Sequence, residues 1–396
     1  MSGEAQRRER YAVLDAWRGI CACLVVLVHV PVAHVFHDAQ RFVNMQLFVD
    51  FFFVLSGFVI YHAYGQRLTT ERSGVGFMIR RFGRVWPLHA AVLAGFVALE
   101  LVKLAATHVM SLTLDGVPFT ADRSWSALVS NLVLTQAFDL HGMTTWNGPA
   151  WSIGVEFYTY AVFAIAVLAF GPRAAVFAGL ALIGLAGVVH FSQKWLFTTH
   201  DFAFWRCLYG FFAGCLVSMA IKQSRDVSGF GNFAELACVA VLLAFIWSTG
   251  HDASSLLAPL IFAIIVYVFA FECGAVSRFL LTAGPQALGL WSYSIYMIHM
   301  LVFAVLKIVF TVAAKVPQLH LSAPVTTPVK LWSFGSPTLD LILVAGELAA
   351  VIALAGLSYA WIEAPARRYF ARLADAVEAA PEMAASSVAA KPGSAG

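Results

Sequence analysis

Ten long apolar stretches restrict what this chain can fold into. Each holds about 20 predominantly apolar residues, the length that an α-helix needs to cross roughly 30 Å of hydrocarbon. The sequence therefore predicts an all-α, polytopic membrane protein with about ten transmembrane helices. These lie near residues 12–34, 47–65, 85–106, 150–171, 174–191, 202–221, 233–250, 254–272, 287–310 and 338–361.

The composition agrees with a membrane location. Of the 396 residues, 60% are hydrophobic and 12% are charged, whereas soluble domains are about half apolar and about a quarter charged. The net charge of +3 is too small to indicate a nucleic-acid partner. The six cysteines lie in apolar stretches and form no CxxC pair, so we expect neither a disulfide framework nor a metal site.

The positions of lysine and arginine predict the orientation. If the N-terminus is cytoplasmic, sixteen of the 25 basic residues lie in inside segments, five in outside segments and four within the apolar stretches. This asymmetry follows the positive-inside rule and predicts that both termini are cytoplasmic. The first stretch carries Asp15, Arg18 and His29, so we do not expect it to be a cleavable signal peptide.

The chain divides into one transmembrane domain, residues 11–370, and a cytoplasmic tail, residues 371–396. The tail is rich in Ala, Ser, Pro and Gly, which predicts that it is mostly disordered. The outside loop 107–149 contains an amphipathic piece, Trp125 to Phe138, which we expect on the outer surface or over a cavity. A second outside loop, 313–337, is rich in Pro and Thr and is expected to be irregular.

Ionisable residues inside the apolar stretches point to a site. A charge at mid-bilayer costs at least ~2.5 kcal/mol, so such residues usually line a cavity or pair with one another. Arg18 and His29 are eleven residues apart, so they lie on nearly the same face of one helix, roughly 16 Å apart along its axis. An imidazole titrates near neutrality, so His29 suits proton removal from a hydroxyl.

Two clusters follow from the depths of these residues. A basic inner cluster suits a phosphate-bearing donor, because guanidinium groups bind phosphate bidentately. An outer cluster of histidine and carboxylates suits base catalysis. The inner cluster comprises Arg18, Arg80, Arg81 and Arg84 with Glu363 and Arg367, and the outer one comprises His29, Asp50 and Glu156, to which Arg206 and His299 can belong.

Structural interpretations compete with these assignments. Arg80, Arg81 and Arg84 can each be a positive-inside anchor, and Asp50 can simply cap its helix. Arg18 with Asp15, and Lys103 with Glu100, have the i to i+3 spacing of local ion pairs.

Six motifs, in order along the chain, resemble those of the acyltransferase-3 family of integral membrane acyltransferases. Any one of them alone would be weak, but together they extend from about residue 11 to 370. They are LDAWRGI at 14–20 with His29, FVDFFFVLSGF at 48–58, RRFGRVWP at 80–87, PAWSIGVEF at 149–157, SYSIYMIH at 292–299 and WIEAP at 361–365.

The resemblance implies O-acyl transfer, usually of acetyl, from cytoplasmic acyl-CoA to a hydroxyl of a carbohydrate or glycoconjugate. It implies a multi-pass protein of the bacterial inner membrane, with acyl-CoA as co-substrate and no bound cofactor. The residue after Glu156 is Phe157, where many relatives carry a second acidic residue. The family's motif positions map onto Arg18, His29, Asp50, Ser56, Arg80, Arg81, Arg84, Glu156, Tyr296, His299 and Glu363.

The predicted mechanism places the donor phosphates on Arg18, Arg80, Arg81 and Arg84, and the thioester in a polar passage toward His29. His29 then acts as general base, oriented by Asp50 or Glu156; an acyl-histidine intermediate is a less favoured variant. The alternative function is a membrane carrier that exports an acyl, sugar or lipid-linked molecule, because a carrier also uses buried charges at mid-depth.

Overall fold

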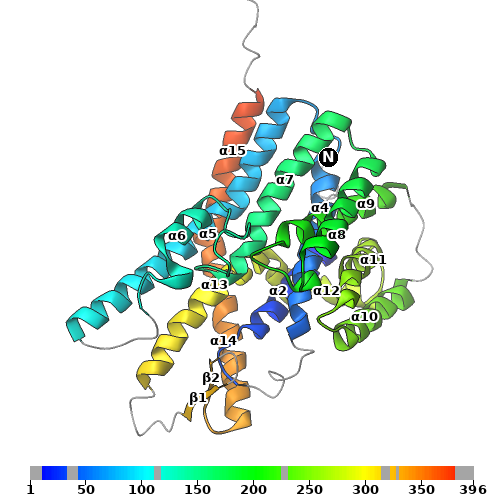
Figure 1. Cartoon of the computed structure of the whole chain (residues 1–396). Coiled ribbons are helices and arrows are strands. Elements are labelled where there is room, and N and C mark those ends of the chain that lie inside the picture. The colour runs from blue at the N-terminus through cyan, green and yellow to red at the C-terminus, as the bar shows by residue number, and fades with distance from the viewer. Residues whose placement is uncertain are drawn as a thin grey trace, which may run out of the picture.

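The computed structural model describes residues 11–33, 43–110, 117–223, 231–313, 322–326 and 330–379, and this part of the chain is mainly helical (Figure 1). Short helical turns join the longer helices: η1 (Asn44–Leu47), η2 (Ala121–Arg123), η3 (Gly148–Ala150), η4 (Trp195–Phe197), η5 (Ala253–Leu257) and the π-helical turn η7 (Tyr359–Glu363). The α-helices are α2 (Ala12–Val28), α4 (Phe48–Tyr64), α5 (Glu71–Met110), α6 (Trp125–Leu132), α7 (Trp151–Phe170), α8 (Ala174–Phe191), α9 (Ala203–Gln223), α10 (Gly231–Ser248), α11 (Ala258–Phe269), α12 (Ala275–Leu280), α13 (Ala283–Ala313), α14 (Pro337–Ser358) and α15 (Ala364–Ala379).

Eight helices of the described part are long and apolar enough to cross a membrane. Their outer surfaces carry large apolar side chains such as Ile165 and Leu182, each 64% exposed, as expected where helices meet lipid. The chain is therefore an integral, multi-pass membrane protein. The other two predicted stretches coincide with α2, which has 17 residues, and with the short apolar helix Ala253–Phe269, so the total of ten spans stays a prediction.

Glycines let the central helices approach closely. A Cβ on Gly289 of α13 would lie 2.5 Å from the Asp15 carbonyl oxygen of α2, and one on Gly19 of α2 would collide with the backbone of Leu288. Small residues at such contacts are how helices associate in lipid, where apolar burial contributes little. The contact sets α2 directly against α13, with Arg18 beside Ser292 near one end and His29 beside His299 near the other.

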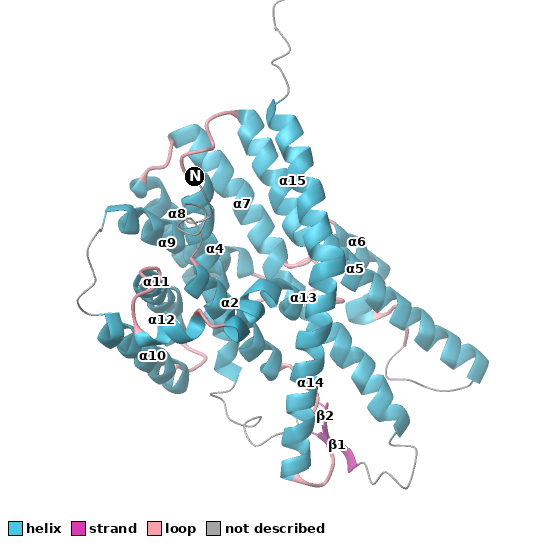
Figure 2. Cartoon of the chain, turned by 180° about the vertical axis from the view of Figure 1, so that it is seen from behind, coloured by secondary structure: helices cyan, strands magenta, loops and turns pink. Residues whose placement is uncertain are grey.

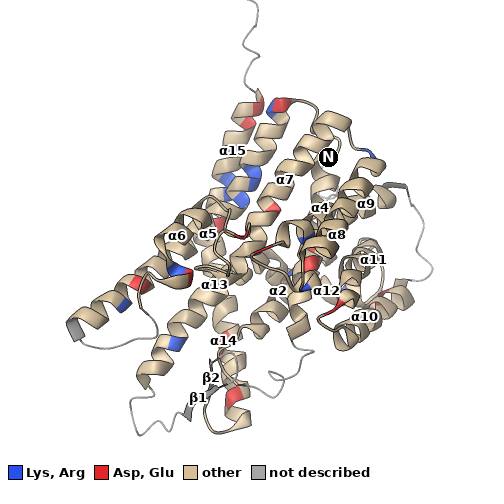
Figure 3. Cartoon of the chain, viewed as in Figure 1, with Lys and Arg blue, Asp and Glu red and all other residues tan. Residues whose placement is uncertain are grey.

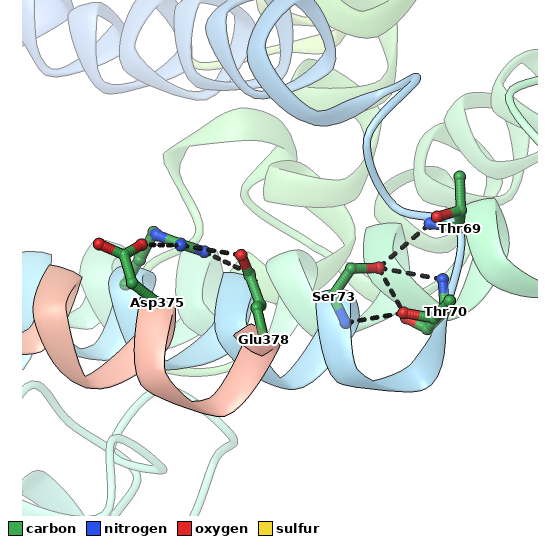
Figure 4. Close-up of polar contacts among 6 residues, drawn as sticks. Thr69, Thr70, Ser73, Asp375 and Glu378 are labelled. Atoms are coloured by element: carbon green, nitrogen blue, oxygen red, sulfur yellow. Dashed lines mark hydrogen bonds and ion pairs between the residues drawn. The ribbon is translucent and has the colours of Figure 1, made fainter. Parts of the chain in front are cut away.

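Helix α15 packs along α5, and basic segments of the two helices adjoin (Figure 3). Asp375 and Glu378 of α15 both point at one guanidinium, that of Arg80, with oxygens 2.5 Å from its nitrogens (Figure 4). Figure 4 also shows the start of α5, where Ser73 N donates to Thr70 Oγ1 at 3.2 Å and Thr70 N donates to Ser73 Oγ at 3.1 Å. This reciprocal capping fixes where the helix begins.

Residues 371–379, which the sequence assigns to a mostly disordered tail, are helical in α15. The contacts with α5 explain the difference, because they stabilise a helix whose own sequence is polar and alanine-rich. Residues 380–396 lie outside the described part of the chain.

The two loops that the sequence assigns to the outside hold more structure than their sequences suggest. Strands β1 (Ser322–Thr326) and β2 (Lys330–Ser333) form an antiparallel pair beside α14 (Figure 2), so the irregular loop predicted for 313–337 is wrong there. β-Branched and aromatic residues at Val325, Thr326 and Trp332 favour strands, and Trp332 also bridges to Val32 after α2.

Helix α6 ends at Leu132, short of the predicted Phe138, and is held by α5. Trp86 Nε1 donates to the Leu132 carbonyl and His89 Nε2 to the Asn131 carbonyl, both at 2.9 Å. The Trp86 donor thus satisfies a carbonyl at the helix C-terminus. His89 adds a second donor to the Asn131 carbonyl, which also accepts from Leu134 N at 3.1 Å.

Candidate active site

A cavity of about 130 Å³ lies among α2, α4, α5, α7 and α13, and we call it the inner cavity. It brings together residues from five of the six sequence motifs. Six predicted site residues line it: Arg18, Ser56, Arg81, Arg84, Glu156 and Tyr296.

Arg18 is held at this cavity by α13 as well as by its own helix. Its Nε donates to Ser292 Oγ at 2.7 Å, and its Nη2 donates to the Gly289 carbonyl at 3.1 Å. Nη2 also lies 3.1 Å from Asp15 Oδ1, so the local ion pair that competes with donor binding is present. Arg18 therefore has a fixed position beside the Asp15 carboxylate.

Arg84 is neutralised by Glu363, which the π-helical turn η7 presents between α14 and α15. Arg84 Nη1 lies 2.7 Å from Glu363 Oε1, and Ser294 Oγ donates to Oε2 at 2.9 Å. Arg367 approaches the same carboxylate at 3.6 Å. Such turns often mark functional sites because they redirect side chains within a helix.

In the described part of the chain, Arg81 has no carboxylate ion-pair partner, unlike Arg18, Arg80 and Arg84. Among the described residues no ion pair involves Arg81, its Nε has no hydrogen-bond partner, and its guanidinium lies 5.4 Å from the centre of the Tyr64 ring. Arg80 points elsewhere, to Asp375 and Glu378 of α15, and does not line the inner cavity. Of the predicted donor residues, Arg81 is thus the cation most available to an anion.

Glu156 lies in the inner cavity and not in the predicted outer cluster. The physical reason is that α7 begins deep in the molecule: Trp146 and Asn147 before it are buried, and Asn147 Nδ2 donates to the Met297 carbonyl in the middle of α13 at 3.0 Å. The Tyr160 hydroxyl donates to Glu156 Oε1 at 2.6 Å.

Asp50 and Arg206 of the predicted outer cluster bind each other. Arg206 Nε donates to Asp50 Oδ1 at 2.9 Å and Nη2 donates to Oδ2 at 2.7 Å, while Nη1 donates to the Thr198 carbonyl at 2.9 Å. Both side chains are fully buried, and the Arg206 guanidinium stacks 5.1 Å from the Trp151 ring centre. This bidentate pair joins α4 to α9. Both carboxylate oxygens of Asp50 are bound by Arg206, so Asp50 does not orient His29.

His29 ends α2 and packs against His299, with the ring centroids 5.2 Å apart. The His29 amide turns back to the Val26 carbonyl, which frees the Val25 carbonyl to accept from His29 Nδ1 at 2.9 Å. Because a carbonyl can only accept, Nδ1 carries the hydrogen, and in the neutral ring Nε2 therefore presents a lone pair. A backbone carbonyl, and neither Asp50 nor Glu156, thus orients the ring.

A larger cavity of about 920 Å³ lies on the other side of the histidines, and we call it the outer cavity. His299 is one helical turn from Tyr296, which lines the inner cavity, and one turn from Phe303, which lines the outer one. His29 is half-buried and lines neither cavity within the described part of the chain. The histidine pair therefore lies between the two cavities and not inside either.

Polar and aromatic side chains surround the outer cavity. Lys307, Trp146 and Trp332 line it together with several threonines. Glu100 holds Lys103 at 3.0 Å and also binds Arg123, which confirms the predicted structural pair and extends it.

Sequence reasoning leaves out several polar lining residues. Among them are Tyr160 and Ser292 of the inner cavity and Lys307 of the outer one. Helical spacing is the signal that could find Tyr160 and Lys307, because Tyr160 lies four residues after Glu156 and Lys307 eight residues after His299.

Comparisons with known proteins identify a family for this chain. The model of a family described as an acyltransferase domain, Acyl_transf_3, matches residues 11–356. Protein 2 in picA locus of Rhizobium radiobacter is 31% identical over 194 residues, 46% of this chain and 93% of that protein. Acyltransferase MdmB of Streptomyces mycarofaciens is 28% identical over 165 residues, 39% of this chain and 38% of that protein.

No solved structure matches the chain significantly. The family match covers most of the chain and every motif up to α14, and a relative is named as an acyltransferase. The chain therefore belongs to the acyltransferase-3 family and is a membrane-embedded acyltransferase.

Proposed function

We propose that this enzyme transfers an acyl group, specifically acetyl, from cytoplasmic acyl-CoA to a hydroxyl of a carbohydrate or glycoconjugate. The observation that carries the proposal is the position of the His29–His299 pair between a basic cavity and a second, larger one. The family assignment favours acyl transfer over the export carrier.

The inner cavity is the donor side in this proposal. Three arginines line it, and Arg81 has no carboxylate partner in the described part of the chain, so an anionic group of the donor would find a cation there.

His29 is the general base. As the acceptor oxygen forms its bond to the thioester carbonyl carbon, the hydroxyl proton passes to His29 Nε2. The carbon–sulfur bond then breaks, and the CoA thiolate takes up that proton. The Val25 carbonyl supports this role, because it holds the hydrogen on Nδ1 and so keeps the Nε2 lone pair available.

The outer cavity is the acceptor side. Tryptophans and hydrogen-bonding side chains together suit a sugar, which has both apolar faces and hydroxyls. We place the inner cavity toward the cytoplasm of a bacterial inner membrane, with ten spans and both termini inside, because the basic residues concentrate on that side.

A deletion strain tests the proposal. Mass spectrometry of its glycans and extracted metabolites should show one species that loses an O-acetyl mass while the unacetylated form is retained. A plasmid carrying the wild-type gene should restore the acetyl mass, and His29→Ala at equal protein level should not. An unchanged acetylation profile, or acceptor trapped inside the cell without loss of an acyl group, would refute the assignment.

A further inference from the structure

His299 has an environment that its contacts within the protein do not explain. The side chain is fully buried in α13, and its Nδ1 donates to the Tyr296 carbonyl at 2.7 Å. Among the residues that the structure describes, no atom forms a hydrogen bond with its Nε2. A buried polar atom left without a partner is unfavourable by about 1–3 kcal/mol. This atom is therefore a candidate for a contact with substrate.

The two histidines present the same kind of atom. In both rings a main-chain carbonyl, that of Val25 or Tyr296, fixes the hydrogen on Nδ1. In the neutral rings both Nε2 atoms therefore present lone pairs, and neither ring can donate a hydrogen bond to the other. Only a group that brings donor hydrogens can satisfy them.

The chemistry of the substrates decides which of them fits. A thioester group has no donor hydrogen, so the reacting group of the acyl donor can satisfy neither Nε2 atom. One hydroxyl satisfies one Nε2, and two neighbouring hydroxyls satisfy both. Phe303, one turn beyond His299, lines the outer cavity, so the hydroxyls would arrive from that side.

We propose that His299 Nε2 accepts a hydrogen bond from a second hydroxyl of the acceptor, adjacent to the hydroxyl that His29 activates. This inference rests on the proposed function and narrows its acceptor to molecules with two neighbouring hydroxyls, as in a sugar ring. The second hydroxyl keeps its proton and forms no covalent bond. His299 is thus an acceptor-binding residue, and only the first hydroxyl is acylated.

Two substitutions separate this role from a structural one. His299→Asn keeps a donor near the Nδ1 position for the Tyr296 carbonyl and removes the acceptor at Nε2. His299→Gln places an amide oxygen near the Nε2 position and loses the Nδ1 donor. A structural histidine should tolerate Asn better than Gln, whereas an acceptor-binding histidine should tolerate Gln better than Asn.

Kinetics in membranes of the deletion strain provide the test, with acetyl-CoA as donor and the unacetylated acceptor from that strain. We expect His299→Asn to raise the acceptor KM about tenfold, which is the loss of one hydrogen bond to a buried partner. His299→Gln should raise it less, and the donor KM should stay within about twofold in both. His190→Asn, on the exposed end of α8, is the matched control and should behave like the wild type.

A second measurement needs no variant. The acetylated product should carry a free hydroxyl next to its acetylated position, and methylation of that hydroxyl should raise the wild-type acceptor KM about tenfold. A product without such a neighbour, or better activity of the Asn variant than of the Gln variant, would overturn the inference and leave the proposed function intact. If the wild type makes no acetylated product, the proposed function fails and the inference fails with it.

Discussion

Variants of the Asp50–Arg206 pair distinguish a structural role for Asp50 from a catalytic one. The Asp50 side chain is 0% exposed and the Arg206 side chain 2%, and two hydrogen bonds join them. Removing one partner of such a pair leaves a buried charge uncompensated, which is destabilising by about 3–5 kcal/mol. Replacing both with apolar residues is often neutral or better.

The corresponding variants are Asp50→Leu, Arg206→Met and the double variant. The double variant loses the Thr198 carbonyl contact, about 1 kcal/mol, and the stacking on Trp151, about 1 kcal/mol. We therefore expect each single variant to lose about 3–5 kcal/mol and the double variant no more than about 2 kcal/mol.

Thermal inactivation of the purified protein in detergent and acetyl transfer per folded molecule measure the two effects separately. The structural interpretation predicts that the double variant transfers acetyl at close to the wild-type rate. A double variant that is folded like the wild type yet inactive would show that Asp50 or Arg206 takes part in the reaction. A stable Asp50→Leu variant would refute the charge argument itself.

Two further predictions each compare two residues of the same type on one helix. Arg81→Gln should raise the acetyl-CoA KM about ten- to a hundredfold, because a hydrogen bond to a charged group contributes about 1.5–3 kcal/mol. Arg80 faces α15, so Arg80→Gln should change this KM less than about twofold. Equal effects of the two substitutions in steady-state kinetics would contradict the different roles of the two arginines. Gly289→Ala should lower the rate of acyl transfer at least tenfold, because its Cβ would press on Asp15 and displace α2. Gly284→Ala on the same helix should be neutral, because its Cβ would meet no atom within 4 Å. Equal activity of the two variants, normalised to folded protein, would argue against the close contact between α2 and α13.

Local sequence patterns are enough to place the helices, because apolar length depends only on neighbouring residues. All ten predicted stretches correspond to helices in the structure. The motifs also identify residues of the inner cavity. Each of the first five motifs contributes at least one side chain that lines this cavity. The sixth contributes Glu363, which pairs with Arg84.

Tertiary packing explains what the patterns miss. A depth that is counted along a helix assumes that the helix starts at the membrane surface. Helix α7 starts instead at the level of Met297. Counting along the sequence therefore places Glu156 nearer the outer surface than the structure does. Arg80 and Arg81 are adjacent in sequence but lie on different faces of α5, and only α15 determines that one of them is paired. The facing of His29 and His299 depends on glycine contacts between α2 and α13 that no single segment contains.

Labelling of membrane vesicles tests the central claim, that His29 acts as general base in the transfer of an acyl group from a cytoplasmic thioester to an outward-facing hydroxyl. Inside-out and right-side-out vesicles from the complemented deletion strain would receive radiolabelled acetyl-CoA from outside. We predict label in the endogenous acceptor of inside-out wild-type vesicles, and none in right-side-out vesicles or in His29→Ala vesicles with equal amounts of folded protein. Wild-type labelling by His29→Ala, or labelling of right-side-out vesicles alone, would contradict it.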